Sequence, residues 1–253
     1  MNNMKSTELN LVNNPAPRIP ICLCLDTSGS MGGALGVCED NCKKEFIDGK
    51  MRDIVSGSIS KINELQKAIE QFYDAICEDD IARYSVELCI VTFDDNAKCV
   101  LDFSNVEKQT DILQLTAKGD TAMGEGVNLA LDLWEKRKKE YMENGVDYYQ
   151  PRLVLMTDGE INGDPNELSK AIERTCKMVS DKKLTIFPVG IGDDVDMSVL
   201  NRFSPNIEAF RLQEHKHQEF FDCLYKSVHT VFKSCPGEDI EFDIEDLKKW
   251  IEL

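Results

Sequence analysis

The sequence predicts an α/β fold with a doubly wound, mostly parallel sheet flanked by helices. Short apolar runs that end abruptly in polar residues predict buried strands, and amphipathic segments between them predict helices. Strands that alternate with helices favour parallel pairing through helical crossovers. A chain of 253 residues is long enough for one large α/β domain or two small ones.

The first predicted strand, residues 19–25, leads into a loop rich in oxygen ligands. Its residues are almost all apolar, which is typical of a strand buried on both faces. Asp26, Ser28 and Ser30 follow it, each two positions from the next. Open α/β sheets bind ligands at the carboxyl ends of their strands. Hard oxygen ligands suit Mg²⁺, with Mn²⁺ or Ca²⁺ as alternatives, so the loop is a predicted metal site.

Two later segments carry matching chemistry. The buried run at 153–156 ends in Thr157, Asp158 and Gly159, and the turn at 119–124 places Thr121 just before a helix. Asp26 and Asp158 together would balance the charge of a divalent cation, and hydroxyl ligands would add no charge.

The remaining elements follow from the same periodicities. Further strands are expected at 84–93, 98–103, 152–157, 184–191 and 209–212, and helices at 58–77, 123–143, 164–179 and 216–233. The turn at 94–96 joins two of these strands into an antiparallel hairpin at an edge of the sheet. Asp164, Pro165 and Glu167 form a helix start signal: a cap, a proline in the first turn, and a glutamate three positions after the cap.

The chain divides into a lead-in at 1–16, a domain at 17–234 and an acidic tail at 235–253. An insertion at about 32–57 follows the metal loop, and it forms either part of the rim of the site or an exposed surface loop. Asp120 either caps the next helix or adds a carboxylate near the site. The tail has apolar residues at helical spacing, which predict a helix that docks on this domain or on another protein.

Charge and composition exclude several classes of protein. Acidic residues outnumber basic ones 46 to 29, and the resulting net charge of −17 disfavours nucleic-acid and anionic-membrane binding. Residues 1–14 are too polar for a signal peptide, and no apolar run approaches the length of a membrane span. We therefore expect a cytoplasmic protein, in which cysteines such as Cys22, Cys24 and Cys89 serve as buried thiols.

The pattern of Asp-x-Ser-x-Ser, then Thr, then Thr-Asp-Gly resembles the metal-ion-dependent adhesion site of von Willebrand factor type A domains. The resemblance covers roughly residues 17–233. Through segments 25–31, 120–127 and 155–161, the chain is most similar to the TerY-type members of bacterial tellurite-resistance and stress operons. The resemblance implies a six-stranded sheet of order 3-2-1-4-5-6 with strand 3 antiparallel. It also implies a metal held by Asp26, Ser28, Ser30, Thr121 and Asp158, with each aspartate binding directly or through water.

The function implied by this resemblance is a metal-dependent protein-binding module in a cytosolic stress or tellurite-resistance complex. A partner would donate an Asp or Glu carboxylate to the bound Mg²⁺. We expect no catalysis, because the sequence offers no identifiable general base and no second aspartate two residues after Asp26. Two alternatives stay open: a Mg²⁺-dependent phosphatase or hydrolase, and an accessory subunit of an AAA+ ATPase machine.

Overall fold

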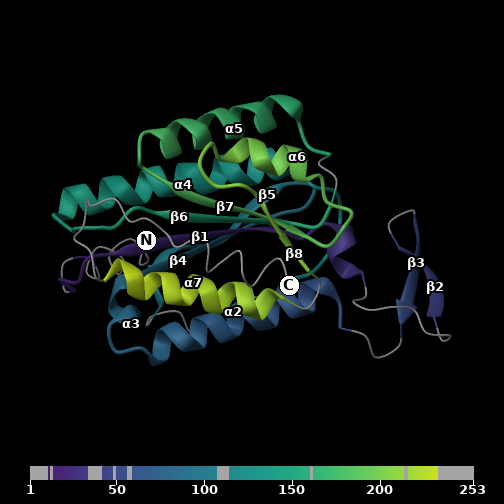
Figure 1. The fold of residues 1–253 in the computed structure, drawn as a ribbon, viewed down its shortest axis with the longest axis horizontal. Coiled ribbons are helices and arrows are strands. Elements are labelled where there is room, and N and C mark those ends of the chain that lie inside the picture. Colours follow the sequence, from purple (N-terminus) through teal and green to yellow (C-terminus); the bar gives the residue numbers. More distant parts are fainter. Residues whose placement is uncertain are drawn as a thin grey trace, which may run out of the picture.

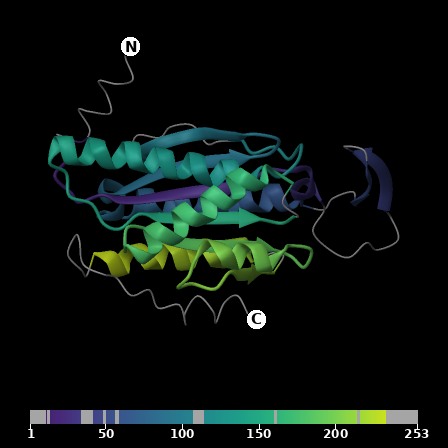
Figure 2. The same cartoon turned by 90° about the horizontal axis from the view of Figure 1, so that it is seen from above.

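A central six-stranded sheet organises the computed structural model (Figures 1 and 2). The structure describes residue 11 and residues 14–33, 42–47, 50–55, 59–106, 114–159, 162–213 and 216–232. The predicted tail at 235–253 and most of the predicted lead-in lie outside these residues.

The order of the strands is β5-β4-β1-β6-β7-β8. Neighbouring strands pair in parallel, except β4 and β5, which are antiparallel. The bounds are β1 (Ile19–Asp26), β4 (Val86–Phe93), β5 (Ala97–Asn105), β6 (Arg152–Thr157), β7 (Thr185–Ile191) and β8 (Phe210–Leu212). The predicted fold class, with order 3-2-1-4-5-6 and an antiparallel third strand, is confirmed.

Helices cover both faces of the sheet (Figure 1). On one face lie α2 (Lys61–Glu78), the short α3 (Ala82–Ser85) and α7 (His217–Val231). On the other lie α4 (Met123–Asn144), α5 (Pro165–Ser180) and the short α6 (Met197–Leu200), which continues into the 3₁₀ turn η3 (Asn201–Phe203). No helix in the described ranges is long and apolar enough to cross a membrane.

The central strand β1 is buried along its whole length because helices pack on both sides of it. Its side chains alternate between two cores, as the two-residue period of a strand requires. Ile21 and Leu23 belong to the core under α2 and α7, whereas Cys22 and Cys24 belong to the core under α4 and α5. This packing holds the carboxyl end of β1 in a fixed position.

Several element boundaries differ from the prediction. The α2 helix begins at Lys61, because Ser60 is the N-cap and its hydroxyl accepts a hydrogen bond from the Asn63 amide at 3.4 Å. The predicted strand at 84–93 begins only at Val86, because the residues before it form α3. In the insertion, β2 (Cys42–Ile47) and β3 (Lys50–Val55) form an antiparallel pair that the sequence did not predict. This pair stands apart from the main sheet in both views (Figures 1 and 2).

Of the two predicted helix caps, one is absent and one is confirmed. Asp120 does not cap α4, because the N-cap is Ala122 and Asp120 is exposed. The other role expected for Asp120, a carboxylate near the site, stays a prediction. Asp164 does cap α5, and its side chain accepts a hydrogen bond from the Asn166 amide at 2.8 Å. The Asp164 amide donates to Glu125 on α4 at 3.3 Å. A tertiary contact therefore replaces the local bond that Glu167 was expected to make.

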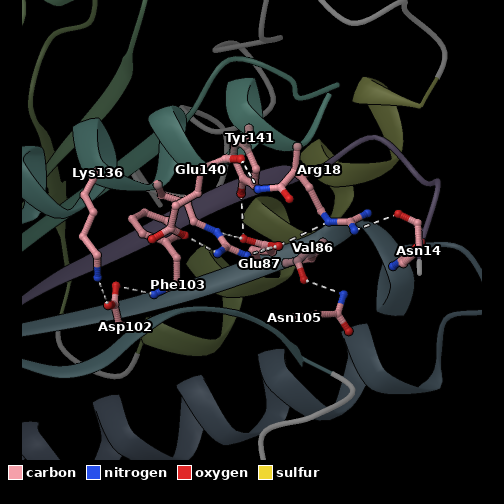
Figure 3. Close-up of polar contacts among 12 residues, drawn as sticks. Asn14, Arg18, Val86, Glu87, Asp102, Phe103, Asn105, Lys136, Glu140 and Tyr141 are labelled. Atoms are coloured by element: carbon pink, nitrogen blue, oxygen red, sulfur yellow. Dashed lines mark hydrogen bonds and ion pairs between the residues drawn. The ribbon is translucent and has the colours of Figure 1, made fainter. Parts of the chain in front are cut away.

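A buried ion-pair cluster fastens β4 to α4 and to the start of β1 (Figure 3). Glu87 on β4 is 1% exposed, and its carboxylate accepts two hydrogen bonds from Arg137 on α4, each 2.7 Å long. Tyr141 donates a third at 2.6 Å, and Arg18 lies 3.2 Å away. Burial lowers the pKa of Arg137, but the hydrogen bonds and charge of Glu87 outweigh it and raise that pKa overall.

Removing the shared carboxylate should destabilise the fold strongly. In Glu87→Ala, Arg18 and Arg137 would stay buried without the Glu87 carboxylate, and Arg137 would keep only its 2.6 Å contact with the partly exposed Glu140. The free energy of unfolding should therefore fall by about 3–5 kcal/mol. Lys136→Ala is the control: Lys136 and its partner Asp102 are 60% and 49% exposed. Its loss should cost about 1 kcal/mol or less. Urea unfolding measures both values, and equal losses would contradict the role assigned to the cluster.

Candidate metal centre

The two predicted aspartates lie where the sheet changes direction. The chain proceeds from β1 to β4 and β5 on one side, and from β6 to β7 and β8 on the other. Asp26 ends β1, and Asp158 follows directly after its parallel neighbour β6. Because parallel strands end at the same edge of the sheet, both carboxylates meet at this switch point, where α/β folds bind ligands.

Asp26 is fully buried and held by both strands. Its Oδ1 accepts a hydrogen bond from the Ser28 amide at 2.7 Å, and its Oδ2 accepts one from the Thr157 hydroxyl at 2.5 Å. Burial, and then the negative charge of Asp158, raise the pKa of Asp26 to about 6, although these hydrogen bonds oppose the rise. The two carboxylates are therefore close enough to repel each other.

A chain of hydroxyls joins the two loops. The Oγ atoms of Ser28 and Ser30 are 2.9 Å apart, and Ser30 donates to Asp158 Oδ1 at 2.6 Å. Ser28 is the N-cap of the 3₁₀ turn η1 (Gly29–Gly32), but its side chain makes no capping bond. Its hydroxyl therefore points into the site.

Thr121 approaches from a third loop and is 3% exposed. Backbone bonds hold that loop against the first: the Gly29 amide donates to Gly119 at 3.0 Å, and the Lys118 amide donates to Thr27 at 2.8 Å. Gly119 has a φ of +69°, a conformation that favours glycine.

Gly159 shows how close the loops come. A Cβ added there would lie 3.2 Å from Ser30 Oγ and 4.0 Å from Thr121 Oγ1. The structure thus gathers all five predicted residues at one edge of the sheet.

Lys61 is a member of this cluster that sequence reasoning missed. Its Nζ donates to Asp158 Oδ2 at 2.9 Å, and the two side chains are 13% and 0% exposed. The sequence places Lys61 at the start of an amphipathic helix, after a long insertion, where it looks like an ordinary surface residue. One signal was present: a cation at the first helical position opposes the helix dipole and needs a compensating anion.

The donor set suits a hard divalent cation. It comprises two carboxylates and three hydroxyls, with no soft ligand, and the repulsion between the buried carboxylates favours a cation between them. Among the described residues, no group of three or more His, Cys, Asp or Glu side chains could hold a metal. The histidines that the structure describes lie elsewhere: His217 contacts Glu64 at 3.1 Å, and His229 contacts Asp79 at 3.0 Å.

Comparison with known structures shows the same architecture at low sequence identity. A von Willebrand factor type A protein from Catenulispora acidiphila aligns with a TM-score of 0.56 and 16% identity, over 83% of this chain and 42% of its own. The D319A mutant of the PilB minor pilin from Streptococcus sanguinis aligns with a TM-score of 0.57 and 16% identity, over 87% of this chain and 64% of its own. This chain therefore spans less than two thirds of these two relatives.

A third structure matches over almost its full length. The vWF domain of the type V pili tip protein Mfa5 from Porphyromonas gingivalis aligns with a TM-score of 0.56 and 13% identity, over 90% of this chain and 99% of its own. A comparison with curated proteins finds no match.

The model of the von Willebrand factor type A domain family matches residues 54–222. Together with the sheet order, this match establishes that the chain belongs to the von Willebrand factor type A domain family. The matched range includes Thr121 and Asp158 but begins after the loop of Asp26, Ser28 and Ser30. The insertion separates that loop from the rest in sequence, whereas the pairing of β1 with β6 joins them in space.

The raised pKa of Asp26 predicts a pH-dependent stability in protein stripped of metal with EDTA. The folded state retains the proton up to about pH 6, whereas the unfolded state releases it near pH 3.8. Between pH 3.8 and 6, unfolding therefore releases the Asp26 proton. The stabilisation of the folded state by this proton is complete below pH 3.8 and is lost as pH rises through 6. Two pKa units correspond to about 3 kcal/mol.

Asp26→Asn should remove this component. Urea unfolding between pH 4 and 7 in EDTA should show the difference in stability between the mutant and the unmodified protein changing by about 2 kcal/mol, since most of the titration lies within this range. A difference that stays constant across this range would contradict the assignment.

Proposed function

We propose that this chain is a protein-binding module with a metal-ion-dependent adhesion site formed by Asp26, Ser28, Ser30, Thr121 and Asp158. One observation carries the proposal: three separate loops bring these oxygen-bearing side chains to the switch point of the sheet, and both carboxylates are buried there. Such a concentration of buried negative charge is costly unless a cation offsets it. Mg²⁺ is the proposed ion, with Mn²⁺ or Ca²⁺ as alternatives.

Each side chain has a distinct task in this proposal. Asp26 and Asp158 offset the charge of the ion, directly or through water. Ser28, Ser30 and Thr121 add neutral oxygens. Hydrogen bonds orient the two serine hydroxyls, and backbone bonds hold the loop of Thr121 against the first loop. When bound, Mg²⁺ would offer a coordination position to an anionic oxygen from outside the chain.

The proposed ligand is an Asp or Glu carboxylate on a protein partner. The chain carries a net charge of −17, so long-range electrostatics oppose an acidic partner. Recognition then rests on the short-range contact with the metal and on a complementary surface around it. The same net charge argues against nucleic-acid or anionic-membrane ligands.

We place this module in a cytoplasmic complex of the stress or tellurite-resistance type. The sequence segments around the site support the stress or tellurite-resistance context. The thiols of Cys22, Cys24 and Cys89, which are free and buried in the core, support only the cytoplasmic location. We propose binding and not catalysis. Mg²⁺-dependent turnover of small phosphoesters would overturn that choice, and stable co-purification with an AAA+ ATPase would indicate an accessory subunit.

Metal binding should stabilise the protein, and mutation of a metal ligand should abolish this stabilisation. A Mg²⁺ concentration one hundredfold above its Kd should stabilise the folded state by about 2.7 kcal/mol and raise the melting temperature accordingly. Asp26→Ala should fold but lose this response. Glu143→Ala is the matched control, because Glu143 is an exposed carboxylate at the C-terminal end of α4, the end of the helix remote from Thr121, and it should keep the response. A Mg²⁺ response that survives in Asp26→Ala would refute the ligand assignment.

Partner binding should depend on the metal. In pull-downs from native lysate with this chain as bait, a partner captured in Mg²⁺ should be lost in EDTA. It should also be lost with Ser28→Ala or Thr121→Ala bait, because each change removes a hydroxyl ligand. Converting one particular partner carboxylate to an amide should have the same effect. A complex that persists unchanged in EDTA would refute partner binding through the metal, even if metal binding itself were established.

A further inference from the structure

A lysine side chain contacts one of the two carboxylates of the candidate metal centre. We propose that Lys61 competes with Mg²⁺ for Asp158 and, once the metal is bound, supplies the positive charge that strengthens binding of an acidic ligand. The inference rests on the proposed function, because it concerns the regulation of the same site.

The geometry places the ammonium directly on a predicted metal ligand. Lys61 Nζ lies 2.9 Å from Asp158 Oδ2, while Ser30 donates to the other oxygen, Oδ1, at 2.6 Å. The Asp158 side chain is 0% exposed and that of Lys61 is 13% exposed. Salt and water therefore screen this pair weakly, and its interaction is stronger than that of a surface ion pair.

The backbone fixes the lysine at this point. The Lys61 amide donates to the Gly33 carbonyl at 3.1 Å, which ties the start of α2 to the end of the first metal loop. Ser60 caps the same helix end. A lysine here faces the positive end of the helix dipole, so its position is unfavourable unless an anion such as Asp158 offsets it.

Charge counting gives the consequence. With Asp26 and Asp158 ionised and Lys61 protonated, these three described groups together carry one net negative charge before metal binding. A divalent ion would change this to one net positive charge, whereas the same centre without Lys61 would become neutral. Lys61 should therefore weaken the binding of Mg²⁺ by repulsion and strengthen the binding of an anionic oxygen by attraction. Its charge thus has opposite effects on the affinities for the two ligands.

The first test is a calorimetric titration of Mg²⁺ into EDTA-stripped, dialysed protein. Lys61→Met keeps a side chain of similar length and removes the charge, so the Kd for Mg²⁺ should fall by about tenfold or more. Lys61→Arg keeps the charge and should stay near the value of the unmodified protein. Lys67→Met removes an exposed lysine from the same helix and should leave the Kd unchanged.

The second test uses acetate as a carboxylate probe on Mn²⁺-loaded protein. Displacement of metal-bound water by acetate lowers the paramagnetic relaxation of water protons. Half-displacement should require several-fold more acetate in Lys61→Met than in Lys61→Arg. Tighter Mg²⁺ binding together with weaker acetate binding is the expected signature, and a general loss of structure would weaken both.

Thermal melting distinguishes failure of the proposed metal site from failure of the role proposed for Lys61. In EDTA, Lys61→Met should melt at a lower temperature than the unmodified protein, and its rise on adding Mg²⁺ should be larger. If this variant does not fold, Lys61→Gln serves instead, since it is neutral but still donates a hydrogen bond to Asp158, and the same directions are expected. If the unmodified protein binds no Mg²⁺, the proposed function fails. If it binds Mg²⁺ and the neutral variants bind it equally or more weakly, this inference alone is overturned.

Discussion

Two carboxylates buried next to each other at the carboxyl ends of β1 and β6 are the constraint on which the rest of the site depends. Their repulsion contributes to the rise in the pKa of Asp26 to about 6, and the fold tolerates it through compensating contacts. Hydrogen bonds from Ser28 and Thr157 stabilise one carboxylate, while Ser30 and Lys61 stabilise the other. Charge that would destabilise an ordinary core is thereby held in place, in an arrangement that suits the proposed cation.

Holding two like charges together requires a rigid sheet. The β1 strand is buried on both faces, so its carboxyl end cannot move without disturbing two cores. Near the amino end of the neighbouring strand β4, the Glu87 cluster ties the sheet to α4 and to the start of β1 (Figure 3). Two buried charged clusters thus stand out among the residues that the structure describes. The Glu87 cluster is satisfied by arginines of the chain itself, whereas the site at Asp26 and Asp158 is suited to an external ion.

Membership of the von Willebrand factor type A family explains the arrangement of the sheet but leaves the chemistry to particular residues. Structures that share the fold are 13–16% identical to this chain, so they define the position of the loops and not the ligand. The family match begins at residue 54, beyond the loop that carries Asp26. The tie between Lys61 and Gly33 shows how the fold restores what the insertion separates: α2 starts beside the metal loop although the insertion lies between them in sequence.

The sequence by itself determined the strands of the main sheet and the long helices, and it singled out the five oxygen-bearing residues that the structure brings together. These depend on local periodicity and on polar residues in the loops at strand ends and helix starts. Tertiary structure decided the rest. It buried Glu87 on β4 and paired it with Arg137, which lies far along the chain. It placed Lys61 on Asp158 and left Asp120 exposed without a capping role. These residues are charged, and the role of a charged side chain depends on partners that are distant in sequence. No local sequence pattern encodes those partners.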